Sequence, residues 1–136
     1  MSKEANKAVE RRMVEEALNR GNMQAVEECL WPDFIYHGPG GTEVKGIEGY
    51  KEFLTKLRTY YPDIHVTIEN ILGEGDQVAT RTLCTFTSSG ANPKSITMAG
   101  SILDRFSNGK IAETWEQYDR YGLYQQLGLI PPGPTP

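Results

Sequence analysis

The sequence is poor in the residues that build metal and redox centres. Its 136 residues include two cysteines, Cys29 and Cys84, and two histidines, His37 and His65. These four residues show no zinc-ligand spacing, and the cysteines are too far apart to form a Cys-x-x-Cys redox pair. We therefore expect no metal site, and we expect both cysteines to be free thiols.

The sequence also lacks an excess of basic residues and a long apolar segment. It carries 14 Lys+Arg against 18 Asp+Glu, which gives a formal net charge of -4. Nucleic-acid binding needs a basic surface, so this balance argues against a nucleic-acid partner. No apolar run approaches the length of a membrane-spanning helix, which argues against a membrane protein. Residues 1–20 lack the apolar centre of a secretory signal, so we expect a cytoplasmic location.

What the chain does contain suits one compact domain. Apolar residues make up 38% of the sequence, and a chain of this length can bury roughly two-thirds of the surface that it exposes when unfolded. We expect a single domain over residues 1–130. The remaining segment, 131–136, is rich in proline and cannot join a helix or a sheet, so it is predicted to be a loose tail.

Apolar spacing predicts three helices in the first half of the chain. Apolar residues recur every three or four positions from Lys3 to Arg20, and Gly21-Asn22 ends this first helix. A second helix is predicted over 23–30, and a third over about 47–61 because Pro62 prevents its continuation. A short strand, 34–37, and a glycine-rich loop lie between the last two helices.

Alternating apolar residues beyond Pro62 predict four longer strands, at about 64–72, 77–87, 95–107 and 110–119. Asn108-Gly109 joins the last two and is the strongest hairpin signal, since both residues tolerate the positive φ angles of a type I′ turn. Helices followed by a meander of strands are typical of an α+β fold. We predict three N-terminal helices packed against one face of a strongly curved antiparallel sheet.

The last predicted strand contains the candidate catalytic residues. Alternation places Trp115 on one face together with Glu113, Gln117 and Asp119. Because Trp115 is the largest apolar side chain of the strand, we predict that this face points into the interior. A buried carboxylate costs several kcal/mol unless it is paired, protonated or set at the wall of a cavity. Asp119 is therefore the first candidate for an acid/base group.

Each candidate also has a purely structural interpretation. Asp119 could cap the turn into Tyr121-Gly122 or pair with Arg120 or Arg81. His37 could simply hydrogen-bond the glycine-rich loop beside it. Arg81, in the interior of a strand, fits a structural ion pair at least as well as substrate binding.

Several short motifs follow one another in an informative order. They are Gly21-Asn22, His37-x-Pro39-Gly40, Pro62-Asp63, Arg81, Asn108-Gly109-Lys110-Ile111, Glu113-x-Trp115-x-x-x-Asp119 and Gln126-Leu127-Gly128. Their order and spacing, over roughly residues 6 to 129, resemble the SnoaL-like polyketide cyclases, a branch of the nuclear transport factor 2-like fold. Many members carry Gly-Thr-His in the second long strand, where this chain has Cys84-Thr85-Phe86-Thr87. A pocket histidine is therefore missing here.

The resemblance implies a conical barrel around a ligand pocket, with Asp119 and His37 as the catalytic residues. It implies ring closure of a small hydrophobic carbonyl compound by intramolecular aldol-type addition, with general acid/base catalysis and no cofactor. The residues expected to bind the substrate are Tyr36, Phe53, Leu57, Arg81, Trp115 and Gln117.

Other functions on the same scaffold stay open at this point, because one fold can host many activities. Isomerisation, dehydration and epoxide hydrolysis are alternatives, and epoxide opening would be favoured by Arg81 bridging Asp104 and Asp119 in one cavity. A non-catalytic ligand-binding module would be favoured by a wholly apolar cavity with Asp119 facing solvent. In each case the exposed face of the sheet suggests a homodimer.

Overall fold

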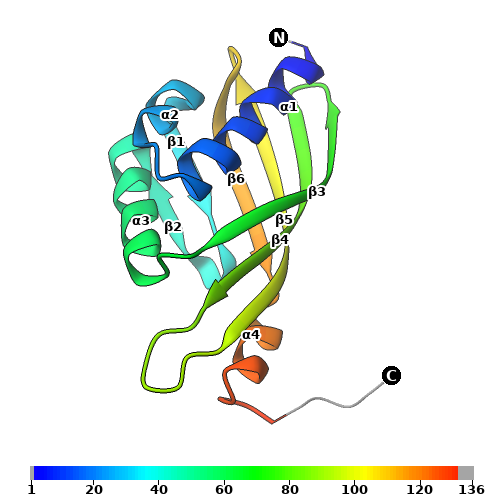
Figure 1. The fold of residues 1–136 in the computed structure, drawn as a ribbon. Coiled ribbons are helices and arrows are strands. Elements are labelled where there is room, and N and C mark those ends of the chain that lie inside the picture. Colours follow the sequence, from blue (N-terminus) through cyan, green and yellow to red (C-terminus); the bar gives the residue numbers. More distant parts are fainter. Residues whose placement is uncertain (1, 132–136) are drawn as a thin grey trace.

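The computed structural model describes residues 2–131, and the predicted proline-rich tail lies outside the described residues from position 132 onward. Three helical regions precede the long strands, and a fourth helix follows them (Figure 1). The helices are α1 (Lys3–Arg12), continued by a π-helical segment (Met13–Asn19), α2 (Met23–Cys29), α3 (Gly46–Tyr60) and α4 (Arg120–Gln126). The strands are β1 (Leu30–His37), β2 (Glu43–Lys45), β3 (His65–Glu74), β4 (Gln77–Thr87), β5 (Ser95–Ser107) and β6 (Lys110–Tyr118).

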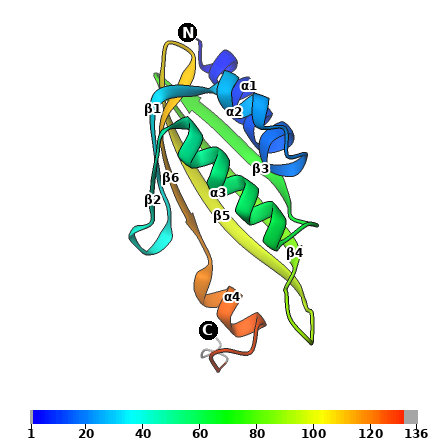
Figure 2. The same cartoon turned by 90° about the vertical axis from the view of Figure 1, so that its left-hand side faces the viewer.

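The six strands form one sheet in the order β2-β1-β6-β5-β4-β3. Strands β3 to β6 are the predicted antiparallel meander, and Asn108 has the positive φ of 50° that the predicted Asn-Gly turn requires. The sheet curves around α1, α2 and α3, which pack on its inner face (Figure 2). The predicted α+β class, with N-terminal helices on a curved sheet, is confirmed.

The sheet differs from the prediction in being mixed rather than antiparallel throughout. Strand β1 pairs with β2 antiparallel and with β6 parallel. Turn residues specify the direction of neighbouring strands, but β1 and β6 are separated by most of the chain, so packing of the intervening elements decides how they pair. The short strand β2 and the helix α4 were also not predicted, because neither is long enough to show a period.

Two apolar clusters form the core and leave a space between the helices and the sheet. One cluster joins α2, α3 and β1 through Val26, Phe34 and Leu54, which are at most 2% exposed. The other lies around β3 to β5 and includes Val66, Phe86 and Ile96. Both cysteines are buried and unpaired, as expected. Within residues 2–131, no helix is long and apolar enough to cross a membrane.

Candidate functional site

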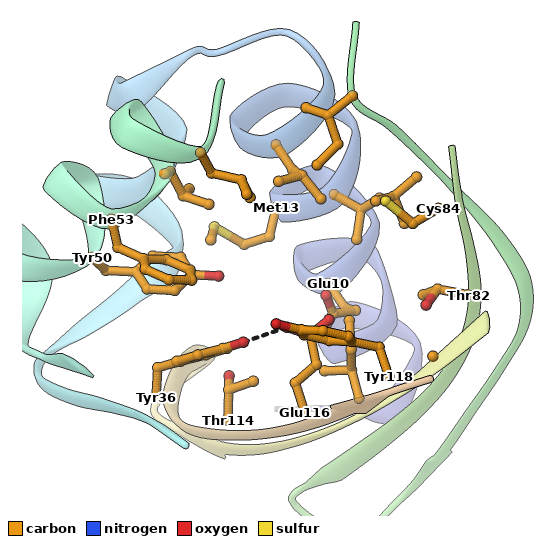
Figure 3. Close-up of a pocket in the computed structure, with 18 of the residues that line it drawn as sticks. Glu10, Met13, Tyr36, Tyr50, Phe53, Thr82, Cys84, Thr114, Glu116 and Tyr118 are labelled. Carbon is orange, nitrogen blue, oxygen red and sulfur yellow. Dashed lines mark hydrogen bonds between the residues drawn. The ribbon is translucent and has the colours of Figure 1, made fainter. Parts of the chain in front are cut away.

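A cavity of about 220 Å³ lies between the helices and the inner face of the sheet (Figure 3). Its wall is formed by β1 and the four long strands together with α1, the π-helical segment that continues it, α3 and Leu123 of α4, and it is mostly apolar and aromatic. The polar exceptions gather on β5, β6 and α1, where Asp104, Glu116 and Glu10 reach the cavity. Its size exceeds the roughly 150 Å³ that accommodates benzene in an engineered protein cavity, so a small bicyclic molecule could fit.

Glu116 is positioned by the alternation of β6. Thr114, Glu116 and Tyr118 share the face of β6 that lines the cavity. Tyr36 comes from β1, where it pairs in register with Thr114, and its hydroxyl donates to Oε1 of Glu116 over 2.6 Å. Figure 3 shows the two side chains meeting at the cavity wall. Glu116 thus keeps a fixed orientation, with its second oxygen available to a bound molecule.

An aromatic wall stands beside this pair. Tyr50 and Phe53, from successive turns of α3, stack with ring centroids 5.7 Å apart. Tyr36 lies 5.2 Å from Phe53 and 5.6 Å from Tyr50, and Phe34 meets the edge of Tyr50 at 5.1 Å. Such a wall excludes water and offers flat surfaces to an unsaturated ligand.

The aromatic surroundings change the acid strength of the groups they cover. Burial raises the pKa of the Glu116 carboxyl, and the hydrogen bond from Tyr36 partly opposes that shift. Burial also raises the pKa of the Tyr36 phenol, as does the neighbouring Glu116 carboxylate. Glu116 is therefore a stronger base than an exposed glutamate, while Tyr36 stays protonated as a donor.

Asp104 is a second carboxyl at the same cavity. It is 1% exposed, and the hydroxyl of Thr114 donates to its Oδ1 over 2.5 Å. Its Oδ2 is buried without a hydrogen-bond partner. Burial raises the pKa of Asp104 to about 7, against the effect of the Thr114 hydrogen bond. The structure thus places a carboxyl that can change its charge near neutral pH beside Thr114.

Glu10 is the third carboxyl, and it comes from α1. It is 3% exposed, with Oε2 buried and unpartnered, and it points into the cavity (Figure 3). The sequence carried a signal for it, because Glu10 precedes Met13 by three positions and Ala17 by seven, on the apolar stripe of the first helix. A charged residue on the buried face of an amphipathic helix is a reason to expect an internal site.

The predicted orientation of the last strand is wrong. Trp115 is 37% exposed and lies on the outer face of the sheet, where its ring stacks on His37 with centroids 5.5 Å apart. The inner face is already filled by aromatic residues from β1 and α3, so the largest side chain of β6 is left outside. Gln117 shares that outer face, in a shallow groove with Trp115 and Leu103.

Asp119 lies outside the cavity, contrary to the expected interior position. Its side chain is exposed and caps α4, accepting a hydrogen bond from the backbone N–H of Gly122 at 2.8 Å. This is the turn-capping role that the sequence left open as an alternative.

His37 and Arg81 also lie away from the cavity. Nε2 of His37 is 2.6 Å from Oε2 of Glu113 on the outer face. The Arg81 guanidinium is exposed and donates to Oδ1 of Asn70 at 2.7 and 2.9 Å. Arg81 therefore does not bridge Asp104 and Asp119, and the arrangement that would favour epoxide hydrolysis is not formed.

Three of the predicted substrate-binding residues do line the cavity: Tyr36, Phe53 and Leu57. Phe53 and Leu57 point inward as the helical period of α3 predicts, and Tyr36 was expected from the family resemblance. Glu10 and Glu116 were not among the candidates, and Asp104 was considered only as a partner of Arg81 in the epoxide-hydrolysis alternative. Among residues 2–131, no group of three or more His, Cys, Asp or Glu side chains is arranged to hold a metal ion.

Comparisons with known proteins identify the family. The family model described as SnoaL-like polyketide cyclase matches residues 8–127 of this chain. A search of curated proteins found no match. Among solved structures, a candidate polyketide cyclase from Acidithiobacillus ferrooxidans is 29% identical, with a TM-score of 0.82 over 94% of this chain and 98% of that one. IdmH, a candidate polyketide cyclase from Streptomyces antibioticus, is 27% identical, with a TM-score of 0.80 over 90% of this chain and 98% of that one.

A more distant structure shares the fold. A candidate SnoaL-like polyketide cyclase from Jannaschia sp. CCS1 is 22% identical, with a TM-score of 0.83 over 96% of this chain and 95% of that one. The nuclear transport factor 2-like architecture implied by the sequence motifs is therefore confirmed. Since the family match spans most of the sequence, the chain belongs to the SnoaL-like polyketide cyclase family.

Proposed function

We propose that this protein is a cofactor-independent enzyme that acts on a small hydrophobic carbonyl compound by general acid/base catalysis. The observation that carries the proposal is the Glu116 carboxyl, held by Tyr36 at the wall of an aromatic cavity. A non-catalytic ligand-binding module would suit a wholly apolar cavity, but this one contains Glu10, Asp104 and Glu116. Membership of the cyclase family supports ring closure as the reaction.

Glu116 would move the proton. Its ionised carboxylate takes a proton from a carbon next to a carbonyl group, and the resulting enolate carbon attacks a second carbonyl carbon of the same molecule. A carbon–carbon bond forms, and the oxygen of the attacked carbonyl receives the proton back from Glu116. No electrons are gained or lost, and the product is an isomer of the substrate. The raised pKa of Glu116 favours both proton transfers. A group whose pKa lies closer to the working pH can both accept and return a proton efficiently.

Hydroxyl groups on the cavity wall would stabilise the developing negative charge. Tyr50 and Tyr118 line the cavity, and burial raises the pKa of both phenols, so each stays protonated. A neutral phenol held in an apolar site is an effective donor to an enolate oxygen, since little water competes for the hydrogen bond. Tyr36 orients the base, and the aromatic wall holds the carbon skeleton.

The test is turnover by Glu116→Gln on a substrate found by screening a panel of β-dicarbonyl compounds. We expect turnover to fall on the order of a hundredfold or more, the usual worth of a general base. Far-UV circular dichroism should stay unchanged, because the amide can still accept the hydrogen bond from Tyr36. Glu113→Gln is the matched control, since it removes a carboxylate from the outer face of the same strand. Parent turnover by Glu116→Gln contradicts the proposal.

A further inference from the structure

The cavity has an excess of hydrogen-bond acceptors and of negative charge at one end. Three carboxyls line it, and no Lys, Arg or His does so within residues 2–131. Two protein hydroxyls serve these groups: Tyr36 donates to Glu116, and Thr114 donates to Asp104. Oδ2 of Asp104 and Oε2 of Glu10 are left without partners, in residues that are 1% and 3% exposed.

Unpartnered buried acceptors are costly, so a ligand that brings donors gains binding energy from them. An ammonium group carries three N–H donors and a positive charge. It therefore supplies both the donors that the unpartnered oxygens lack and the positive charge that the carboxyls lack. The neighbouring faces of Tyr36, Tyr50 and Phe53 add a second attraction, because aromatic rings attract cations when water is excluded. An anionic ligand would gain no cationic partner among the lining residues and would be repelled by the ionised carboxyls.

We propose that the cavity binds a ligand with a protonated amine, placed among Glu10, Asp104 and Glu116, and an aromatic or otherwise flat apolar body against the wall formed by Tyr36, Tyr50 and Phe53. This inference deepens the proposed function and rests on it for the carbonyl part of the substrate, which would then be an amino-carbonyl compound. The ammonium site itself depends only on the carboxyls and the aromatic wall.

Binding of the amine should release protons. Burial raises the pKa of Asp104 to about 7, so at neutral pH this carboxyl is partly protonated, and an arriving cation favours its ionised form. The other titratable groups that face the carboxyls are Tyr36, Tyr50, Tyr61, Cys84 and Tyr118. Burial raises the pKa of each of them, so they stay neutral near pH 7 and do not contribute to the release.

The experiment compares three probes that share one ring system: 2-naphthylmethylamine, 2-naphthylmethanol and 2-naphthoate. Isothermal titration calorimetry at pH 7 would give their affinities, and repeating it in phosphate and in Tris would count the protons released. We expect the amine to bind at least tenfold more tightly than the alcohol, with proton release for the amine only, and the naphthoate to bind most weakly.

The variants Asp104→Asn and Glu116→Gln test which groups are responsible. Each should lower the ratio of amine to alcohol affinity several-fold, while the alcohol still binds. Glu15→Gln is the matched control, because it removes an exposed carboxylate outside the cavity. The inference is overturned if the alcohol binds as tightly as the amine, if none of the probes binds, or if the variants keep the preference. These affinities do not depend on turnover, so absence of an amine preference would overturn the ammonium site alone, and turnover by Glu116→Gln tests the proposed function separately.

Discussion

Tyr36 and Glu116, 80 positions apart in the sequence, are joined by a hydrogen bond of 2.6 Å from the phenol to Oε1 of the carboxyl. The parallel pairing of β1 with β6 brings them together, and α3 covers them with Tyr50 and Phe53. The bond favours the ionised form of Glu116, while burial favours the neutral form. The two residues together therefore set the pH range in which this carboxyl can act as a base.

Replacing Tyr36 with Phe should move the pH dependence of catalysis. The donated hydrogen bond lowers the pKa of Glu116, so its removal should raise that pKa further and shift the acid limb of the kcat/KM profile to higher pH. We expect turnover on the plateau to stay within about tenfold of the parent, because the base itself remains. Tyr60→Phe, at a residue that is 64% exposed, is the control. An unshifted profile would show that the bond does not tune Glu116.

Asp104 should make the protein less stable as the pH rises. Its pKa is about 7 in the folded protein, against the ordinary value of 3.8. Between these two pH values the folded state therefore binds more protons than the unfolded state does. The stability from the protonated carboxyl is fully present below about pH 4 and is lost as the pH rises through 7. Thermal unfolding from pH 4 to 9 should show this loss, on the order of a few kcal/mol. In Asp104→Asn the slope should flatten, whereas Asp33→Asn should keep it.

Substitutions at Asp119 separate its capping role from the catalytic role that the motifs implied. Asp119→Ala removes the cap of α4 and should cost about 1 kcal/mol, whereas Asp119→Asn keeps a capping oxygen and should cost less. Both variants should turn over within a few-fold of the parent, measured beside Glu116→Gln on the same substrate. A hundredfold loss for Asp119→Asn with unchanged unfolding would assign the catalysis to Asp119 instead.

The outer face of the sheet is the surface through which we propose that two copies associate. It exposes Leu72 (70%) on β3, Leu103 (37%) on β5 and Trp115 (37%) on β6, which line one shallow groove. Exposed apolar side chains grouped on one face indicate a contact surface. We expect sedimentation to show a dimer at micromolar concentration and Leu103→Glu to give a monomer. Leu129→Glu, at a residue that is 68% exposed and lies outside this groove, should leave the dimer intact. A monomeric parent protein would refute the proposal.

The sequence by itself determined the first three helices, the four long strands and the fold class. Apolar residues at helical spacing located the first three helices, and alternation after Pro62 located β3 to β6 with their turns. These features depend on local backbone geometry and on which residues share a face, and both can be read from neighbouring positions. The inward direction of Phe53 and Leu57 followed from the helical period of the third helix.

Only the tertiary structure decided which face of β6 points inward. Alternation divides Thr114, Glu116 and Tyr118 from Trp115 and Gln117, but it does not say which set meets the helices. Pairing of β6 with β1 and β5, together with the space already filled by aromatic residues, turned Trp115 outward and Glu116 into the cavity. The candidate site followed that choice, because a strand exposes every second side chain to the same side. The local sequence therefore predicted the strand, and packing between distant segments determined which of its side chains face the cavity.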